Sequence, residues 1–500
     1  MRPAPSPSRL VALSALVAGC VSPPLEAPQP TTDQSTSFTY SQNPRNKVDV
    51  LFLIDNSSSM SAMSAELSAR FDQFFEVFQD LSAAGTAQAD LHVGVVTSDF
   101  GAGRGVPGAC DPSPGGQRGK LQALGVAAPA DCLPPRGANY IEYAFSADGK
   151  SPNNLPPGQT LLKTFTCMAS VGTGGCGFEH QLESVYSALH DPIPENQGFV
   201  RPGALLAVVF LTNEDDASAP PDTDVFDSSL TAQYGIEDSY SRQTRFAIVC
   251  GPAPGTFPPY GDSGGPLANC RAAPNPDGMG PGKQYDISRY IDFFTRPASQ
   301  GGVKNHPNDV ILVGIDAPSD PFQVILSNPQ TPGQQPYVAC APLDERSNPV
   351  CAPVLQHSCQ NPQNPAFFGD PAVRLNQVVA AAAHHHWSSI CDSDYTGALQ
   401  DLAHLIGGEF GAGCVPAPLP DPDHADCVVE DVTLAADGSQ TVTAVPQCDP
   451  AAPAFPCWRV EAKAACAGDS PQGIGITIDR NGAPPPDDTD ARVSCATLVD

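Results

Sequence analysis

The sequence of 500 residues predicts an α/β protein built on a doubly wound, mostly parallel sheet and followed by a small β module. Three observations support this fold class. Several short segments are apolar at nearly every position, as in strands that are buried on both faces of a parallel sheet. Segments with apolar residues at helical spacing lie between these strands, as expected when helices cover a sheet. From about residue 420 the chain changes to short β-like runs with five cysteines, typical of a small module braced by disulfides.

The N-terminal residues have the composition of an export signal. Two arginines precede an apolar stretch that begins at Leu10, and small residues at 17–19 precede Cys20. The apolar stretch is about half of the ~20 residues that a membrane-spanning helix needs, which argues against a permanent transmembrane anchor. We therefore expect residues 1–19 to be a signal peptide and residues 20–46, rich in Pro, Ser, Thr and Gln, to be a flexible tether.

The tetrapeptide Val17-Ala18-Gly19-Cys20 resembles the lipobox of bacterial lipoproteins. The resemblance implies that Cys20 is lipidated and becomes the new N-terminus, so that the protein reaches a membrane through its lipid alone. Several acyl chains anchor a protein stably, whereas one chain does not. An ordinary signal peptide with a chance cysteine is the alternative.

The cysteine count agrees with export to an oxidising compartment. The chain has 17 cysteines, and a lipidated Cys20 would leave 16, an even number. The cysteines are not grouped in C-x-x-C pairs, so the spacing of a zinc site is absent from the sequence. Disulfide bonds are therefore expected.

The charge balance excludes one class of function. The chain has 54 acidic and 25 basic residues, for a formal net charge of −29. Such a surface repels the phosphates of nucleic acids and anionic lipid headgroups. We therefore expect no nucleic-acid partner.

The first strand–helix unit begins near Val48. Residues 48–54 are almost all apolar and partly β-branched, and Asp55 follows at the carboxyl end of this expected strand. After a polar turn, apolar residues recur at helical spacing from Met63 to Leu81, which predicts an amphipathic helix that covers the sheet.

The same order of elements continues along the chain. Further buried strands are expected at 91–97, 204–211 and 310–315. Further helices are expected at 178–189 and 395–406, the second ended by Gly407-Gly408. Insertions that carry cysteines are expected near 101–160, 251–283 and 332–370. The run His384-His385-His386-Trp387 is expected to be a polar helix end, with transition-metal binding as the alternative.

The motif Asp55-x-Ser57-x-Ser59 can place three hard oxygen donors around one point. Mg²⁺ and Ca²⁺ prefer such ligands, and open α/β sheets hold ligands beyond the carboxyl ends of their strands. A helix N-cap is the alternative, because Asp and Ser are also favoured there. The motif, with the buried strand before it and the helix after it, resembles the first loop of the metal-ion-dependent adhesion site of von Willebrand factor A domains, the fold of integrin inserted domains.

The resemblance implies a metal centre completed by two more loops. Thr173, in a glycine-rich turn before a helix, stands where the family has its second-loop threonine. In the third loop Asn213 stands where the family usually has an aspartate, so one negative charge is absent. Either Asn213 is a weak ligand, or the nearby Asp215 or Asp216 replaces it, or the site has lost strong affinity. Mg²⁺ is the expected cation, with Ca²⁺ or Mn²⁺ as alternatives.

The resemblance covers most of residues 47–415 and implies a non-enzymatic binding function; residues 420–500 form the separate β module. We expect a lipid-anchored protein of the bacterial cell envelope, at the outer membrane or cell surface. Its metal ion would coordinate a carboxylate of a protein or surface ligand, as in adhesion. A structural envelope protein with a degenerate metal site is one alternative. The insertions would shape partner specificity if they surround the metal face, and otherwise they are stapled surface loops.

The segment Gly261-Asp262-Ser263-Gly264-Gly265-Pro266-Leu267 raises a second class of function. It is identical to the segment that bears the nucleophilic serine of chymotrypsin-like proteases. That family needs a general-base histidine and an aspartate earlier in the chain, on an all-β scaffold. The upstream histidines lack the Ala-Ala-His-Cys setting of the family, and the surrounding pattern alternates strands with helices. A secreted serine hydrolase that uses Ser263 is the alternative, and a Gly/Pro-rich loop is the simpler interpretation.

Overall fold

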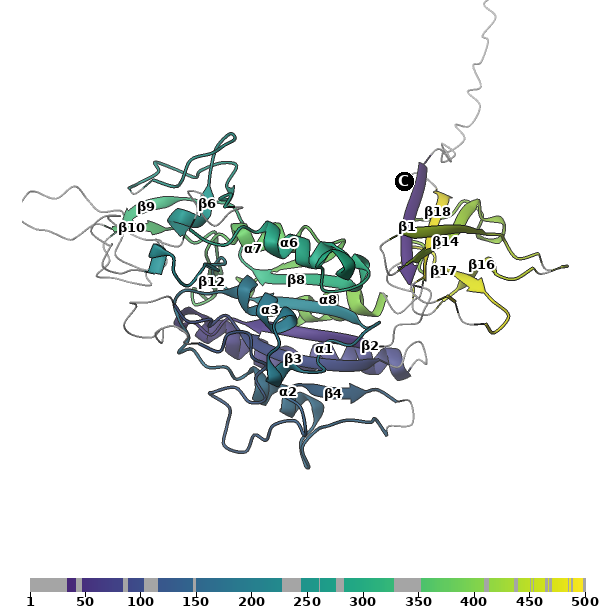
Figure 1. Ribbon diagram of the computed structural model, residues 1–500, viewed down its shortest axis with the longest axis horizontal. Helices are drawn as coiled ribbons and strands as arrows, with labels where there is room; N and C mark the ends of the chain where they lie inside the picture. The colour runs from purple at the N-terminus through teal and green to yellow at the C-terminus, as the bar shows by residue number, and fades with distance from the viewer. Residues whose placement is uncertain are drawn as a thin grey trace, which may run out of the picture.

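A computed structural model describes most of the chain from residue 34 onward. The described residues are 34–41, 47–83, 89–102, 116–146, 150–226, 244–259, 261–275, 283–327, 352–408 and 413–497, apart from short gaps at 436–438, 450, 453, 464–465, 467–469, 484 and 487–488. Three regions follow one another along the long axis of the molecule (Figure 1). They are a group of loops and short strands, a central sheet with helices, and a second set of strands.

The central sheet has six strands in the order β13-β8-β5-β2-β3-β4. Its strands are β2 (Lys47–Ile54), β3 (Asp90–Thr97), β4 (Ile141–Ala144), β5 (Leu205–Leu211), β8 (Val310–Asp316) and β13 (His384–Ser389). Neighbouring strands are parallel except for β4, which pairs antiparallel with β3 at one edge. The prediction of an α/β sheet with a parallel core is confirmed, and the structure adds the antiparallel edge.

Helices pack against both faces of this sheet. One apolar cluster joins the sheet to α1 (Ser61–Ala83), α2 (Leu161–Ala169) and α8 (Thr396–Gly408). A second cluster joins it to α3 (Gln181–His190), α6 (Ser288–Thr295) and α7 (Val373–Val379). Alternate residues of β2 serve the two clusters, with Phe52 in the first and Leu51 and Leu53 in the second. Because both faces are covered, the strand is apolar at every position from Val50 to Ile54.

Short strand pairs in or beside the second and third insertions lie beyond the carboxyl ends of the parallel strands (Figure 1). The pairs are β6 (Ile248–Val249) with β7 (Arg271–Ala272), β9 (Val324–Ser327) with β10 (Ala352–Leu355), and β11 (Cys359–Gln360) with β12 (Phe368–Gly369). They therefore lie on the side of the sheet where α/β proteins hold their ligands.

The small β module contains a four-stranded sheet in the order β1-β18-β14-β15. Its strands are β1 (Gln34–Ser41), β14 (Cys427–Leu434), β15 (Gln440–Val445) and β18 (Thr489–Thr497), and β16 (Cys457–Ala462) pairs separately with β17 (Ile474–Asp479). β1 corrects the prediction that all of residues 20–46 are tether. The reason is Tyr40, whose ring is buried in the module and whose hydroxyl donates to the Ile476 carbonyl over 3.1 Å. Cys20, the signal peptide and the rest of the expected tether lie outside the described residues.

The histidine run forms a strand, and the prediction of a helix end is wrong. His384–Ser389 is β13, which pairs in parallel with β8 at the edge of the central sheet. His385 and Trp387, at alternate positions of this strand, are exposed. An edge strand with one face in contact with solvent tolerates polar residues, so it lacks the apolar pattern that marks the central strands.

Six disulfides join cysteines among the described residues, which confirms the prediction of disulfide bonds. Three brace the small β module, namely Cys414–Cys466, Cys427–Cys495 and Cys448–Cys457. The others are Cys132–Cys167, Cys250–Cys270 and Cys359–Cys391, each with at least one cysteine in or beside an insertion.

Candidate metal centre

The carboxylate of Asp55 is held at the carboxyl end of β2 by three hydrogen bonds. The Ser57 amide and the Ser98 hydroxyl donate to Oδ1 over 2.8 and 3.0 Å, and the Thr212 hydroxyl donates to Oδ2 over 2.7 Å. Asp55 is fully buried, and burial raises the pKa of its carboxyl although these hydrogen bonds oppose the shift. The carboxylate thus has a defined position at the point where β2, β3 and β5 end.

A row of hydroxyl and amide oxygens connects the first loop to the loop after β5. The Ser57 and Ser59 hydroxyls are hydrogen-bonded at 2.9 Å. Ser59 Oγ in turn lies 2.9 Å from Asn213 Oδ1 and 3.3 Å from Glu214 Oε1. Ser57 stands at the N-cap of a short 3₁₀ turn, but its side chain makes no capping hydrogen bond. The structure therefore brings Asp55, Ser57, Ser59 and Asn213 together, and capping does not account for the serines.

Thr173 lies in a loop that touches the first loop from another side. The Gly175 amide donates to the Asn56 carbonyl over 2.8 Å. A Cβ at Gly175 would lie 2.3 Å from Asn56 Oδ1, so this close approach requires glycine. Thr173 itself is exposed and makes no hydrogen bond within the described part of the chain. The loop is thus adjacent to the site, and the threonine side chain is not engaged in it.

Asp215 and Asp216 make hydrogen bonds and an ion pair with helices α3 and α7, not with the Asp55 motif. Asp215 accepts hydrogen bonds from the Arg374 and Leu375 amides at the start of α7, over 3.0 and 3.1 Å. Asp216 accepts from the Leu182 amide over 2.9 Å and forms a buried ion pair with the Arg374 guanidinium at 3.1 Å. Burial raises the pKa of Asp215 to about 6. Both aspartates attach α3 and α7 to the β5 loop, whereas Glu214 is the acidic residue that contacts Ser59.

Glu214 belongs to an acidic group that the motif did not reveal. Burial raises the pKa of its carboxyl well above the usual range, and the neighbouring charges of Glu179, Asp370 and Asp55 add to the shift. Glu214 directly follows Asn213, so its position in the sequence indicates that it lies near the site. Glu179 and Asp370 come from distant segments, and no local pattern marks them.

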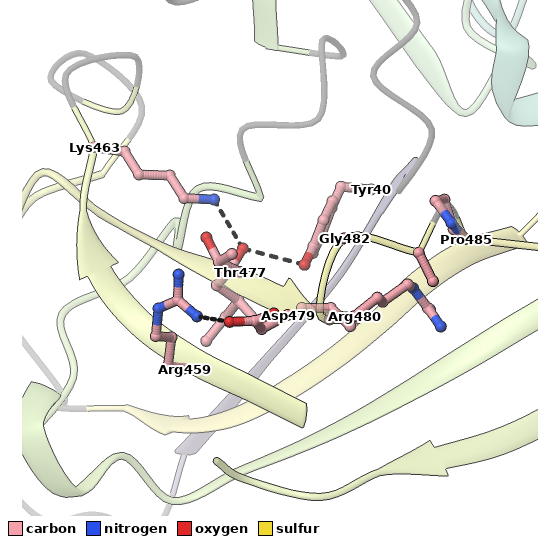
Figure 2. Close-up of a pocket in the computed structure, with 11 residues that line it drawn as sticks. Tyr40, Arg459, Lys463, Thr477, Asp479, Arg480, Gly482 and Pro485 are labelled. Atoms are coloured by element: carbon pink, nitrogen blue, oxygen red, sulfur yellow. Dashed lines mark hydrogen bonds and ion pairs between the residues drawn. The ribbon is translucent and has the colours of Figure 1, made fainter. Parts of the chain in front are cut away.

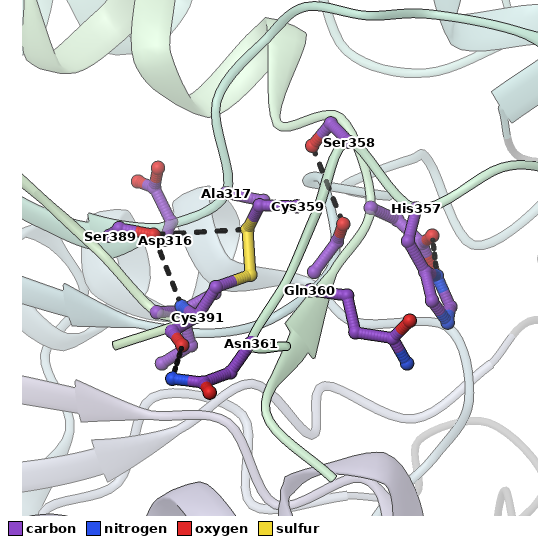
Figure 3. The surroundings of a disulfide bond; sticks show 12 residues. Asp316, Ala317, His357, Ser358, Cys359, Gln360, Asn361, Ser389 and Cys391 are labelled. Atoms are coloured by element: carbon purple, nitrogen blue, oxygen red, sulfur yellow. Dashed lines mark hydrogen bonds and ion pairs between the residues drawn. A yellow bond between two sulfur atoms is a disulfide. The ribbon is translucent and has the colours of Figure 1, made fainter. Parts of the chain in front are cut away.

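The third insertion reaches this site through a stapled hairpin, residues 357–370, that contains β11 and β12. The Asp370 amide donates to the Asn213 carbonyl over 2.8 Å. Asp370 Oδ1 lies 2.6 Å from His357 Nδ1, and the disulfide Cys359–Cys391 ties the hairpin to the residues after β13 (Figure 3). At least this insertion therefore borders the candidate site.

The donor set suits a hard cation in part. Carboxylate, hydroxyl and amide oxygens are ligands of Mg²⁺ and Ca²⁺. Within the described residues, no three His, Cys, Asp or Glu side chains form a group that could hold a metal ion, so hydroxyl and amide oxygens would have to complete the set. Gln181 lies beside Thr212. Its Nε2 donates to the Thr212 hydroxyl over 3.0 Å, while its buried Oε1 has no hydrogen-bond partner among the described residues.

Ser263 is not part of a comparable polar site. Its hydroxyl donates to the Gly265 carbonyl over 2.6 Å and to the Val324 carbonyl over 3.0 Å. Among the described residues, no histidine is hydrogen-bonded to it. These contacts fasten the loop to β9, as in the simpler interpretation of this segment.

A pocket of about 440 Å³ lies in the small β module, lined in part by Arg459, Lys463 and Arg480 (Figure 2). Arg459 pairs with Asp479 at 2.8 Å, and Arg480 pairs with Asp431 at 2.6 Å. Lys463 donates to the Ile476 carbonyl over 2.9 Å, and burial lowers its pKa to about 8. The basic side chains of this pocket thus take part in contacts within the module.

Comparison with known proteins identifies no family. No protein-family model matches the chain, and no curated protein is similar to it. Among solved structures, the chain is similar to the adhesive tip pilin GBS104 of Group B Streptococcus agalactiae, with 13% identity, a TM-score of 0.26, and coverage of 92% of this chain and 80% of that chain. It is also similar to the pilus adhesin RrgA of Streptococcus pneumoniae, with 12% identity, a TM-score of 0.28, and coverage of 93% and 58%. The chain thus spans little more than half of the second protein.

Proposed function

We propose that residues 47–415 are a von Willebrand factor A-like domain that binds a divalent cation and uses it to hold a protein or surface ligand. The observation that carries the proposal is the contact between Ser59 and Asn213, whose Oγ and Oδ1 atoms lie 2.9 Å apart. It joins the Asp55 motif to the loop after β5 at the carboxyl edge of the sheet. Ligands of open α/β sheets bind at this edge.

The residues that would hold the cation come from two loops. Asp55, Ser57 and Ser59 stand on one side, and Asn213 and Glu214 stand on the other. Thr173 is on the adjacent loop and would join the set by a change of its side-chain position. When bound, the cation supplies an electrophilic centre with an open position for an oxygen of the partner, such as a carboxylate. The protein residues orient this centre, and an adhesive or scaffolding role follows.

The proposed location is the bacterial cell envelope, with a lipid anchor at Cys20. Six disulfides among the described residues support folding in an oxidising compartment. Within that part of the chain, no helix has the length and hydropathy to span a membrane. Mass spectrometry of the mature protein tests the anchor, because a lipidated Cys20 would be the first residue and would carry acyl chains.

Titration calorimetry with Mg²⁺, Mn²⁺ and Ca²⁺ tests the metal site. We expect binding to the wild type and none to Asp55→Ala, because that change removes the charged oxygen of the first loop. Ser59→Ala is the milder companion variant, since Ser59 is only partly buried and its loss leaves the Asp55 hydrogen bonds in place. If the wild type binds none of the three ions, the metal-dependent function is wrong. A pull-down from envelope extracts, with and without EDTA, then tests the partner.

The serine hydrolase remains the second candidate because of the sequence around Ser263. A fluorophosphonate probe separates the two. We expect no labelling, since the Ser263 hydroxyl is engaged with backbone carbonyls. Labelling of the wild type that disappears in Ser263→Ala would favour the hydrolase.

A further inference from the structure

We infer that Asp370, carried to the site by the stapled hairpin, supplies negative charge that Asn213 does not, so that cation affinity depends on the third insertion. The inference rests on the proposed function, because it concerns the same metal site. It assigns a positioning and charge-supplying role to a residue that lies far from the Asp55 motif in the sequence.

The first step is the position of Asp370. Its amide donates to the carbonyl of Asn213 over 2.8 Å, so the backbone of the hairpin is fastened to the loop that would hold the cation. Asp370 is buried, with 6% of its surface exposed. Glu214, the residue after Asn213, has its Oε1 atom 3.3 Å from Ser59 Oγ. Asp370 is therefore a near neighbour of the oxygen row.

The second step is the rigidity of the hairpin. β11 and β12 pair Cys359 with Gly369, and Cys359 is bonded to Cys391 just beyond β13. Asn361 Nδ2 donates to the Cys391 carbonyl over 3.1 Å, which adds a second link near the disulfide (Figure 3). The hairpin is thus fixed to the central sheet at one end and to Asn213 at the other.

The third step is the orientation of the Asp370 side chain. His357 Nδ1 lies 2.6 Å from Asp370 Oδ1, and both side chains are less than a tenth exposed. The His357 ring stacks on Phe368, with ring centroids 4.2 Å apart. His357 therefore holds one carboxylate oxygen of Asp370 in place.

The fourth step is the effect of the Asp370 charge on cation affinity. Hard-cation affinity depends on the number of charged ligands, and Asn213 is neutral. A buried acidic group can be structural, but one acceptor oxygen in this region lacks a partner. Gln181 Oε1 is buried with no hydrogen-bond partner within the described residues. Gln181 Nε2 donates to the Thr212 hydroxyl and to the Glu214 backbone carbonyl, so this amide lies at the loop after β5, and a cation bound there would give its oxygen a partner.

Calorimetry with Ca²⁺ and with Mg²⁺ tests the inference on the full chain. Asp370→Asn should weaken binding of the ions at least tenfold, the usual minimum for loss of a second-layer group at a metal site (~10–100-fold). Asp392→Asn is the control, because it removes an exposed carboxylate next to Cys391, the other end of the same disulfide. It should change affinity less than twofold. Near-ultraviolet circular dichroism without metal verifies that each variant is folded.

His357→Gln separates the effect of the Asp370 charge from that of its hydrogen bond to His357. This variant loses the ring that orients Asp370 but keeps the carboxylate, and it should bind the ions within threefold of the wild type. Unchanged affinity in Asp370→Asn, or an equal loss in His357→Gln, would overturn the inference while leaving the metal site intact. Absence of binding in the wild type would instead overturn the proposed function, and the inference with it.

Discussion

Ser59 and Asn213 meet across the carboxyl edge of the sheet, with Ser59 Oγ 2.9 Å from Asn213 Oδ1. They come from the loops after β2 and β5, two strands that are neighbours in the sheet and distant in the sequence. The contact joins the motif that marks the site to the position where a charge is missing. Ser59 thus belongs to the motif that predicts the metal site, and Asn213 is the neutral residue that is expected to lower its affinity.

Asn213→Asp should increase Mg²⁺ affinity by less than about tenfold. The reason is that Glu214 and Asp370 already place two carboxyl groups beside this position, so a further carboxylate adds little. Calorimetry of the variant and the wild type measures the change. A gain of a hundredfold or more would indicate a decayed site and would contradict compensation by these two residues.

Removal of the staple should act in the same direction as Asp370→Asn. The double variant Cys359→Ser/Cys391→Ser opens a disulfide with a sequence separation of 32 residues. Loss of such a link costs ~3–4 kcal/mol of unfolding free energy in the chain-entropy model. We expect a lower melting temperature and weaker Ca²⁺ binding. Wild-type affinity in the folded double variant would show that the site does not need the hairpin to be fixed.

Asp316→Asn should flatten the pH dependence of stability. Asp316 is fully buried at the end of β8 and accepts a hydrogen bond from Trp387 Nε1 over 2.7 Å. Burial raises its pKa well above the usual range. As pH rises above ~4, the carboxyl ionises in the unfolded chain and stays protonated in the folded one. The free energy of unfolding of the wild type therefore falls until pH passes the raised pKa.

The variant lacks this proton, so its melting temperature should decrease less than that of the wild type between pH 4 and 7. Asp320→Asn, at an exposed position, should keep the wild-type slope. Parallel curves for the wild type and Asp316→Asn would refute the assignment of a protonated buried carboxyl.

Acylation of Lys463 should be half-maximal near pH 8. Burial lowers the pKa of this amine to about 8, whereas a lysine in water titrates near ~10.4. Since the neutral amine is the nucleophile, the reaction should rise at a lower pH than for ordinary lysines. Peptide mass spectrometry after a short exposure to an acylating reagent measures this. A Lys463 profile that matches the bulk of the lysines would contradict the effect of burial.

The strands of the central sheet could be predicted because burial on both faces leaves a simple mark in the sequence. Residues 204–211 are apolar throughout and residues 48–54 are apolar except for Asp49, and both segments form parallel strands. β13 carries no such mark, because the edge of the sheet tolerates polar residues such as the exposed His385. β1 lacks this mark too, since Phe38 and Tyr40 are the large apolar residues in an otherwise polar segment.

The site could be predicted only as far as its local motif extends. Asp55, Ser57 and Ser59 are close in sequence, and their contact with Asn213 follows from the pairing of β2 with β5. The roles of Asp215 and Asp216 cannot be predicted from the local sequence. Their partners, Arg374 and the amides at the start of α7, come from a distant helix. Asp370 depends on the fold of an insertion and on a disulfide, and neither is encoded in a short motif.

A crystal of the protein soaked in Mn²⁺ and measured at the manganese absorption edge tests the central claim most directly. The proposed function predicts an anomalous peak beside the Ser57 and Ser59 hydroxyls, between Asp55 and Asn213, and no such peak in Asp55→Ala. A map with no peak at this position would contradict it.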